Sequence, residues 1–272
     1  MTVKSGSGQA NTRKTGNSRT IAIAGKGGTG KTTLATLLIK YLLNEDKGYV
    51  LAIDGDPSSN LNLALGMELE ETVGHIREDM ATQVKSGGYT QSIPKTDYLE
   101  YRIQAALVEG NGVDLIAMGR PEGPGCYCAA NNILRAVIDR LGNDYDYVVI
   151  DNEAGMEHIS RQTARHIDIL FIVSDPTVRG LSAAEGIARL ATELGAHGTR
   201  VSRMYAVVNR WSGAFPAGFL ERIRAAGLEF IGTLPNDPQV GELDLAGRPL
   251  VELGEDSPLY RAAKEIFQKV GI

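Results

Sequence analysis

Beyond residue 19, short apolar runs alternate with longer segments in which apolar residues recur with helical spacing. The short runs are predicted strands, at residues 20–25, 49–54, 113–119, 146–151, 167–174, 203–209 and 229–234. The periodic segments are predicted helices, most clearly at residues 31–43, 131–141, 182–194 and 257–270. This alternation predicts an α/β fold, in which one mostly parallel sheet is covered by helices on both faces.

The regular alternation is interrupted between residues 68 and 112. Two weaker helical patterns, at 71–83 and 96–108, are joined there by Ser86-Gly87-Gly88-Tyr89. An insertion of this kind usually lies at the rim of a sheet, where it is either a surface that binds a partner protein or merely covering structure. We therefore expect a single domain over residues 20–272 that includes this irregular insertion.

Residues 1–19 precede this domain and contain almost no apolar side chains and no Asp or Glu. Such a segment cannot bury enough surface to order itself, so we expect a flexible tail. It also lacks the apolar run of a signal peptide.

Composition narrows the classes of function. Lys and Arg number 28 against 33 Asp and Glu, so the formal net charge of the 272-residue chain is −5. This mild acidity argues against a nucleic-acid surface held by bulk charge, and no apolar run approaches the roughly 18 residues of a membrane span. The 2 cysteines are too few and too close together to stabilise a secreted fold by disulfide bonds, which favours a protein of a reducing compartment. We expect a cytoplasmic protein without a nucleic-acid or membrane partner.

A phosphate-binding motif follows the first predicted strand directly and opens the first predicted helix. From Gly25 to Thr33 the chain reads G-K-G-G-T-G-K-T-T, which satisfies the pattern G-x-x-x-x-G-K-[ST]. Its glycines let backbone N–H groups turn toward phosphate oxygens, and the helix start adds the positive end of its dipole. Lys31 is predicted to reach the β- and γ-phosphates, and the Thr32 hydroxyl to ligate Mg²⁺. ATP or ADP with Mg²⁺ is the expected cofactor, and its expected loop contacts are Gly27, Gly28, Thr29, Gly30, Lys31, Thr32 and Thr33.

The second lysine of this loop, Lys26, makes the motif more specific. The run K-G-G-T-G-K-T-T resembles the deviant Walker A sequence of the SIMIBI-type ATPases, which include the nitrogenase iron protein and the cell-division, partition and metal-insertion ATPases. The resemblance implies a P-loop domain that hydrolyses ATP as a homodimer. It also implies that Lys26 crosses the interface to the phosphates of the partner's nucleotide.

Two acidic segments at strand ends extend the resemblance. The run D-G-D-P after the second strand resembles the family's switch I, which implies that Asp56 positions or deprotonates the attacking water. The run D-N-E-A-G after the fourth strand resembles switch II, which implies that Asp151 holds Mg²⁺ through water and that Gly155 approaches the γ-phosphate. The expected catalytic residues are Lys26, Lys31, Asp56 and Asp151.

Two later strand ends match the family's base-binding segments. Asn209 and Arg210 follow one strand, and Pro235 follows the next. The resemblance implies that Asn209 pairs with the purine edge and that the segment around Pro235 closes over the base. The alternative for Asn209 is an ordinary turn residue.

Both cysteines, Cys126 and Cys128, lie in a Gly- and Pro-rich turn that opens a predicted helix. A helix N-terminus lowers the pKa of a thiol, which favours metal binding. Two ligands cannot fill a tetrahedral site, but a two-fold dimer would supply four thiolates and predicts one metal per dimer. Soft sulfur ligands favour Zn²⁺, Ni²⁺ or Cu⁺. The alternative is an unreactive or redox-labile pair.

The segment from Gly119 to Cys128 is similar to the nitrogenase iron protein around its first cluster cysteine, which matches Cys128. The second cluster cysteine of that family corresponds to His158, so the chain departs from the iron–sulfur reductases there. The C-x-C pair together with D-x-x-A-G-x-E-H looks like the carbon monoxide dehydrogenase maturation ATPases. That resemblance implies nickel (or zinc) held between subunits by Cys126 and Cys128, with His158 as a hydrogen-bonding residue or an auxiliary ligand.

The function that the resemblance implies is a homodimeric ATPase that inserts nickel into carbon monoxide dehydrogenase. One alternative is a positioning ATPase of the MinD/ParA kind, acting on DNA or a membrane through a basic patch or a basic amphipathic C-terminal helix. The apolar face of the helix at 257–270 favours docking on the sheet instead. The other alternative is an ATP-gated iron–sulfur electron donor, which the replacement of the second cluster cysteine by His158 disfavours.

Overall fold

The computed structural model describes residues 18–86, 95–119, 139–153, 166–195 and 198–272. Its strands are β1 (Arg19–Gly25), β2 (Val50–Asp54), β3 (Val108–Glu109), β4 (Val113–Ala117), β5 (Tyr147–Asp151), β6 (His166–Ser174), β7 (Arg200–Asn209) and β8 (Glu229–Leu234). Its helices are α1 (Lys31–Asn44), α2 (Leu61–Leu65), α3 (Val73–Lys85), α4 (Lys95–Ala105), α7 (Val178–Leu194), α8 (Phe219–Ala225), α9 (Pro238–Leu245) and α10 (Pro258–Lys269), with short 3₁₀ turns at Gly142–Asp144 and Leu250–Glu252.

The described strands form one sheet of 8 strands in the order β3-β4-β2-β5-β1-β6-β7-β8. Only the pairing of β3 with β4 is antiparallel, and the other pairs are parallel. The predicted α/β fold with a mostly parallel sheet is therefore confirmed. The two-residue edge strand β3 was not predicted, because it is too short to show an alternating pattern.

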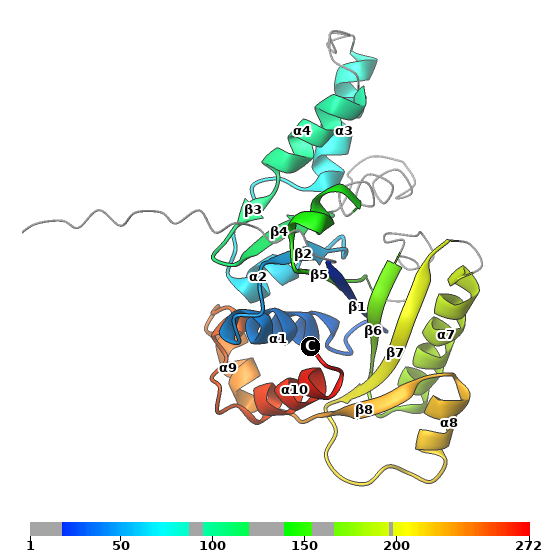
Figure 1. The fold of residues 1–272 in the computed structure, drawn as a ribbon. Coiled ribbons are helices and arrows are strands. Elements are labelled where there is room, and N and C mark those ends of the chain that lie inside the picture. The colour runs from blue at the N-terminus through cyan, green and yellow to red at the C-terminus, as the bar shows by residue number, and fades with distance from the viewer. Residues whose placement is uncertain (1–17, 87–94, 120–138, 154–165, 196–197) are drawn as a thin grey trace, which may run out of the picture.

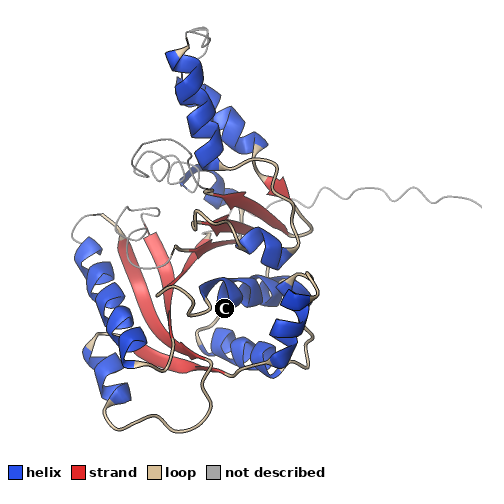
Figure 2. Cartoon of the chain, turned by 180° about the vertical axis from the view of Figure 1, so that it is seen from behind, coloured by secondary structure: helices blue, strands red, loops and turns tan. Residues whose placement is uncertain are grey.

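Helices cover both faces of the sheet (Figures 1 and 2). Successive residues of β1 point to opposite faces, so Ile21 and Ile23 join one core and Ala22 and Ala24 join the other. Helices α1 and α10 pack in the Ile21 core, and α7 and α8 pack in the Ala22 core. Because the apolar face of α10 is buried in that core, the expectation that the C-terminal helix docks on the sheet is confirmed.

The insertion is a helical hairpin that projects from one end of the sheet (Figure 1). Its two helices, α3 and α4, follow the two weak patterns of the sequence to within a few residues. Val73, Ile76 and Ile103 anchor its inner end in the Ala22 core. We call residues 71–105 the arm.

The arm is joined to the sheet through the end of β4. The backbone N–H of Met118 donates to the carbonyl of Asp54 at 2.7 Å, and the carbonyl of Met118 accepts from the N–H of Gly74 at 2.8 Å. A Cβ on Gly119 would lie 2.2 Å from Oγ1 of Thr72, the N-cap of α3. The root of the arm therefore packs against the strand end from which the cysteine-bearing segment continues.

Candidate nucleotide and magnesium site

The loop between β1 and α1 is closed by its own polar groups. The hydroxyl and the N–H of Thr29 both donate to the carbonyl of Lys26, at 2.8 and 3.3 Å. Thr29 is buried, whereas Lys26, Gly27 and Gly28 are exposed. Local hydrogen bonds thus fix the turn and leave its outer side open to a ligand.

Gly30 ends this loop and begins α1 in a left-handed conformation, with φ of 97°. A Cβ at this position would lie 2.2 Å from Nδ2 of Asn209. Gly30 provides no side chain to cap the first N–H groups of α1. These groups are therefore available to an anion at the positive end of the helix dipole.

Lys31 is buried, with 7% of its surface exposed, and its Nζ lies 3.4 Å from the carbonyl of Lys26. Burial lowers the pKa of the Lys31 ammonium, although the nearby carboxylates of Asp151, Asp56 and Glu153 oppose that shift. A buried cation with few partners is suited to binding phosphate oxygens, which would neutralise it.

Thr32 and Asp151 meet at the end of β5. The Thr32 hydroxyl donates to Oδ2 of Asp151 at 2.6 Å. The other carboxylate oxygen, Oδ1, is buried and has no hydrogen-bond partner among the described residues. Burial raises the pKa of Asp151 to about 7, the Thr32 hydrogen bond opposes the shift, and neighbouring Asp54 adds to it.

This donor set fits Mg²⁺, because a hydroxyl and a carboxylate oxygen are hard ligands and the unsatisfied Oδ1 needs a positive partner. A bound cation would also stabilise the charged form of Asp151. The structure thus brings together the two residues that the sequence assigned to magnesium.

Switch I begins at the buried Asp54, whose two carboxylate oxygens hold the following loop. Oδ1 accepts from the N–H of Asp56 at 3.0 Å, and Oδ2 accepts from the N–H of Leu61 at 2.9 Å. Asp56 itself is half-buried and accepts from the N–H of Ser58 at 2.8 Å. The N–H of Gly55 donates to the carbonyl of Asp151 at 2.8 Å, so this loop is attached directly to the strand end that carries Asp151.

Sequence reasoning missed the role of Asp54. The signal was present, because an acidic residue at a strand end two places before another is suited to an Asx turn. It also missed Asn152, whose amide and backbone N–H both donate to the carbonyl of Ile23, at 2.8 and 3.1 Å. That contact joins two segments far apart in the sequence, so no local sequence pattern could have predicted it.

The predicted base-binding residues lie on the other side of the phosphate loop. The amide of Asn209 donates to the carbonyl of Thr29 at 2.8 Å, and its oxygen accepts from the N–H of Arg210 at 2.9 Å. Arg210 is exposed and adopts a left-handed conformation, with φ of 57°. Pro235 is half-buried at the end of β8.

Two positions after Pro235 lies another residue that was not among the predicted site residues, Asp237. Asp237 caps α9 by accepting from the N–H of Gln239 at 3.0 Å, and its other oxygen accepts from the Ser257 hydroxyl at 2.5 Å. Burial works against a low pKa for Asp237, but its hydrogen bonds outweigh this and lower the pKa. The segment expected to close over the base is thus attached to the start of α10.

A groove of about 440 Å³ opens beside the start of α1. Thr32 and Thr33 lie on one wall, and residues of α2 and α9 form the others. Leu63, on the α2 wall, is 68% exposed.

The remaining predicted residues, Cys126, Cys128, Gly155 and His158, lie outside the described residues. No described helix combines the length and apolar character that crossing a membrane requires.

The chain is similar to known proteins over most of its length. The family described as the CobQ/CobB/MinD/ParA nucleotide binding domain matches residues 20–250. An uncharacterised ATP-binding protein of Methanocaldococcus jannaschii, MJ0685, is 42% identical over 92% of this chain and 97% of its own. The carbon monoxide dehydrogenase accessory protein CooC of Rhodospirillum rubrum is 31% identical over 86% of this chain and 89% of its own.

Among solved structures, the septum site-determining protein MinD of Pyrococcus horikoshii, complexed with Mg-ADP, has a TM-score of 0.65 and 22% identity over 94% of this chain and 96% of its own. At that identity the likeness concerns the fold alone. The match to the family over residues 20–250, together with the geometry of the phosphate loop, establishes that the chain belongs to the CobQ/CobB/MinD/ParA family of P-loop nucleotide-binding proteins.

Proposed function

We propose that the chain is an ATP hydrolase whose phosphate loop holds ATP with Mg²⁺. The observation that carries this proposal is the Thr32–Asp151 hydrogen bond, beside which the other, buried carboxylate oxygen of Asp151 has no hydrogen-bond partner in the part of the chain that the structure describes. Thr32 and Asp151 would hold the ion, which when bound offsets negative charge on the phosphates. Lys31 would turn from the Lys26 carbonyl to the phosphates, because they bind its charge better than a carbonyl oxygen does.

Asp56 is the residue that we propose to orient the attacking water. Asp56 lies close enough to Lys31 and Asp151 for its negative charge to raise the pKa of each. The rigid carboxylate of Asp54 fixes the backbone from which Asp56 projects. An oriented water needs such a fixed support, because misplacing the nucleophile forfeits much of the rate.

We propose a homodimer in which Lys26 reaches the partner's nucleotide. Two observations support this proposal: the loop resembles the deviant Walker A sequence, and Lys26 is exposed. An exposed side chain at this position can extend toward a second subunit.

We further propose that the cargo is Ni²⁺, held by Cys126 and Cys128 of two subunits, and that the acceptor is carbon monoxide dehydrogenase. The CooC relative supports this, since it is 31% identical and the chain covers 89% of its length. The bond from Met118 to the Asp54 carbonyl also supports it, because the cysteine-bearing segment begins at Gly119, beside switch I. Metal affinity and nucleotide state would then be reciprocally coupled.

An anaerobic titration with Ni²⁺ and with Zn²⁺ tests this proposal, with the oligomer mass read in parallel. The parent protein is compared with a Cys126→Ala/Cys128→Ala variant, each without nucleotide, with ADP and with a slow ATP analogue. We expect one metal per dimer at a thiolate site, lost in the cysteine variant and shifted in affinity by nucleotide. A Lys31→Ala control should retain the metal and lose the shift.

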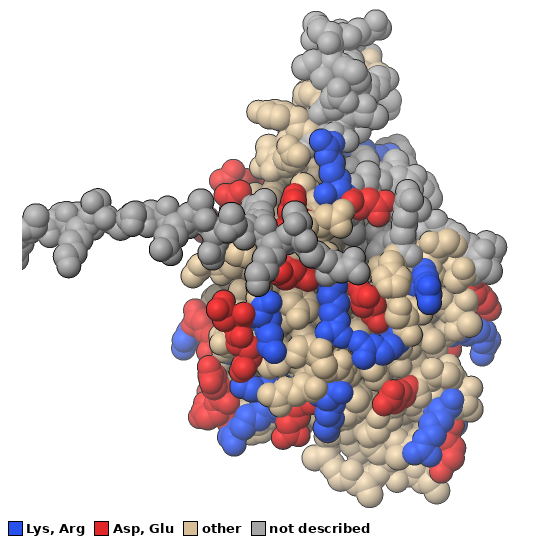
Figure 3. All heavy atoms as spheres, viewed as in Figure 1, with Lys and Arg blue, Asp and Glu red and all other residues tan. Residues whose placement is uncertain are grey.

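Equal affinity in all nucleotide states would contradict the coupled mechanism, and no thiolate-bound metal would remove the nickel proposal while leaving ATP hydrolysis. The second candidate is a positioning ATPase of the MinD/ParA kind, because the matching family includes the MinD and ParA proteins. Against it, the apolar face of α10 is buried, and basic and acidic side chains are interspersed on the face drawn in Figure 3. ATP-dependent pelleting with DNA or liposomes would favour this candidate.

A further inference from the structure

The arm carries a cluster of side chains that the nucleotide site does not use. Among the described residues, Glu71, His75 and Asp79 form a group whose potential metal-ligand atoms all lie within 4.8 Å of one another. We propose that these three residues bind one divalent transition-metal ion per chain.

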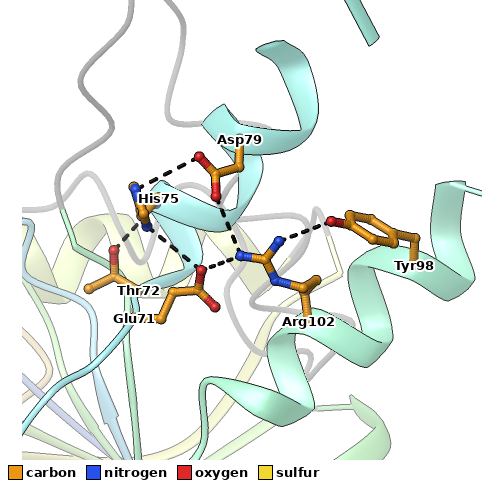
Figure 4. Close-up of polar contacts among 6 residues, drawn as sticks. All are labelled: Glu71, Thr72, His75, Asp79, Tyr98 and Arg102. Atoms are coloured by element: carbon orange, nitrogen blue, oxygen red, sulfur yellow. Dashed lines mark hydrogen bonds and ion pairs between the residues drawn. The ribbon is translucent and has the colours of Figure 1, made fainter. Parts of the chain in front are cut away.

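The spacing of the three residues places them on one side of the arm (Figure 4). They are four positions apart, and residues four apart in a helix lie one above the other. Thr72 caps α3 by accepting from the N–H of His75, at 3.3 Å. This cap fixes the start of the helix and brings Glu71, which precedes it, over His75.

The imidazole of His75 stands between the two carboxylates. Its Nδ1 lies 3.7 Å from Oε1 of Glu71, and its Nε2 lies 3.8 Å from Oδ1 of Asp79. Either ring nitrogen can therefore share a metal ion with the adjacent carboxylate. The second carboxylate lies within reach of the same ion, because the potential ligand atoms of the three residues all lie within 4.8 Å of one another.

Arg102 on α4 positions both carboxylates from the opposite helix. Its guanidinium contacts Glu71 and lies 3.4 Å from Oδ2 of Asp79, and Tyr98 accepts from the same guanidinium at 2.9 Å. Oδ1 of Asp79 is left facing the imidazole (Figure 4). Two carboxylates outnumber one guanidinium, so the cluster keeps an excess of negative charge that a cation would offset.

The ligand types determine the class of metal. Imidazole nitrogen favours Zn²⁺, Ni²⁺ or Cu²⁺, whereas Mg²⁺ and Ca²⁺ prefer oxygen ligands alone. The side chains of His75, Asp79 and Glu71 are 58, 40 and 21% exposed, so the ion can enter from solvent and water can complete its coordination.

The site lies beside the start of the cysteine-bearing segment, because Gly119 packs against Thr72. Metal binding by the arm does not depend on the proposed function. Its use as an entry site for the cargo metal does rest on that function, since it needs Cys126 and Cys128 as the acceptors.

Calorimetric titration of tag-free protein with Zn²⁺ alone, and with Ni²⁺ alone, tests the arm site. The Cys126→Ala/Cys128→Ala variant is the parent, without nucleotide, so neither the cysteine pair nor bound nucleotide contributes. We expect one ion per chain, and a roughly tenfold or greater loss of affinity in His75→Ala, since even outer-shell changes cost that much. His166→Ala is the matched control and should bind as the parent does, because His166 is an exposed imidazole, 49%, 3.1 Å from the single carboxylate of Asp168.

Unchanged affinity in His75→Ala would overturn the proposal and leave the cluster as an ion-pair contact between α3 and α4. If that variant loses helix by circular dichroism, Asp79→Asn provides the second test and should also weaken binding. A shift of the His75 ring resonances on adding Zn²⁺, absent for His166, is the expected independent signature. Stoichiometry separates the two metal proposals, because the cysteine site predicts one ion per dimer and the arm predicts one per chain.

Discussion

Asp54 and Asp151 occupy matching positions on the neighbouring parallel strands β2 and β5, and both carboxyl groups are buried. Both oxygens of Asp54 accept backbone N–H groups of switch I. Asp151 has one oxygen that accepts from Thr32, and its other oxygen has no partner among the residues that the structure describes. Two acids in similar surroundings thus differ in function: Asp54 supports a loop, and Asp151 is open to a cation.

The stability of the nucleotide-free protein should fall as pH rises from about 4 to about 7. Burial raises the pKa of Asp151 to about 7 and that of Asp54 to about 6, from an ordinary value of 3.8. The folded chain then keeps protons that the unfolded chain has released in this window, so the free energy of unfolding decreases with pH. For Asp151 the loss is on the order of 4 kcal/mol.

Urea denaturation between pH 4 and pH 8, without Mg²⁺ or nucleotide, measures this slope. Asp151→Asn removes one of the two titrating groups, so the free energy of unfolding should depend less on pH in this variant than in the parent protein. The difference between the two slopes is the relevant quantity. The same slope in both proteins would contradict the assignment.

Thr32→Ala should lower the rate of ATP hydrolysis by roughly two orders of magnitude or more, because it removes a magnesium ligand and the hydrogen bond that positions Asp151. Thr32→Ser keeps the hydroxyl and should restore most of the activity. Hydrolysis as a function of Mg²⁺ concentration is the measurement, and equal activity in both variants would exclude the Thr32 hydroxyl as a ligand.

Gly30→Ala should weaken nucleotide binding more than Gly28→Ala does. Both positions have positive φ, 97° and 75°, but a Cβ at Gly30 would lie 2.2 Å from Asn209, whereas one at Gly28 would have no described atom within 4 Å. Gly28→Ala therefore measures backbone strain alone, and the excess in Gly30→Ala measures the collision. Adding Asn209→Ala to Gly30→Ala should recover part of that excess, and fluorescent-nucleotide titration of these three variants and the parent protein measures both effects.

Asp54→Asn should reduce kcat with little change in nucleotide affinity. An amide has only one acceptor oxygen, so it cannot accept both N–H groups that hold switch I, while the phosphate loop lies on other elements. Single-turnover hydrolysis and equilibrium binding separate the two effects. A loss confined to affinity would show that Asp54 supports the phosphate loop instead of the catalytic step.

The parts of this protein that the sequence predicted are those with a local cause. The phosphate loop depends on glycines and a lysine within one turn, and the helices of the arm depend on periodicity within each segment. Even the weak patterns at 71–83 and 96–108 led to real helices.

The parts that could not be predicted depend on contacts between distant segments. Asn152 donates to the carbonyl of Ile23 on the neighbouring strand β1, 129 positions away in the sequence. The cluster on the arm was missed for a similar reason: Glu71, His75 and Asp79 lie on adjoining turns, but the guanidinium that orders them belongs to the second helix.

Met118 connects the arm to switch I at the inner end of the arm, so a small rotation there would move the outer end of the arm much further. Its N–H contacts the Asp54 carbonyl and its own carbonyl contacts Gly74, so the arm is rooted at the edge of switch I. Helix α3 has 13 residues, and at about 1.5 Å per residue its far end lies ~20 Å from the root. A tilt of about 10° at Met118 would then move that end by ~3 Å, so a rearrangement too small to break the hydrogen bonds of Met118 would become a displacement that a second protein can sense.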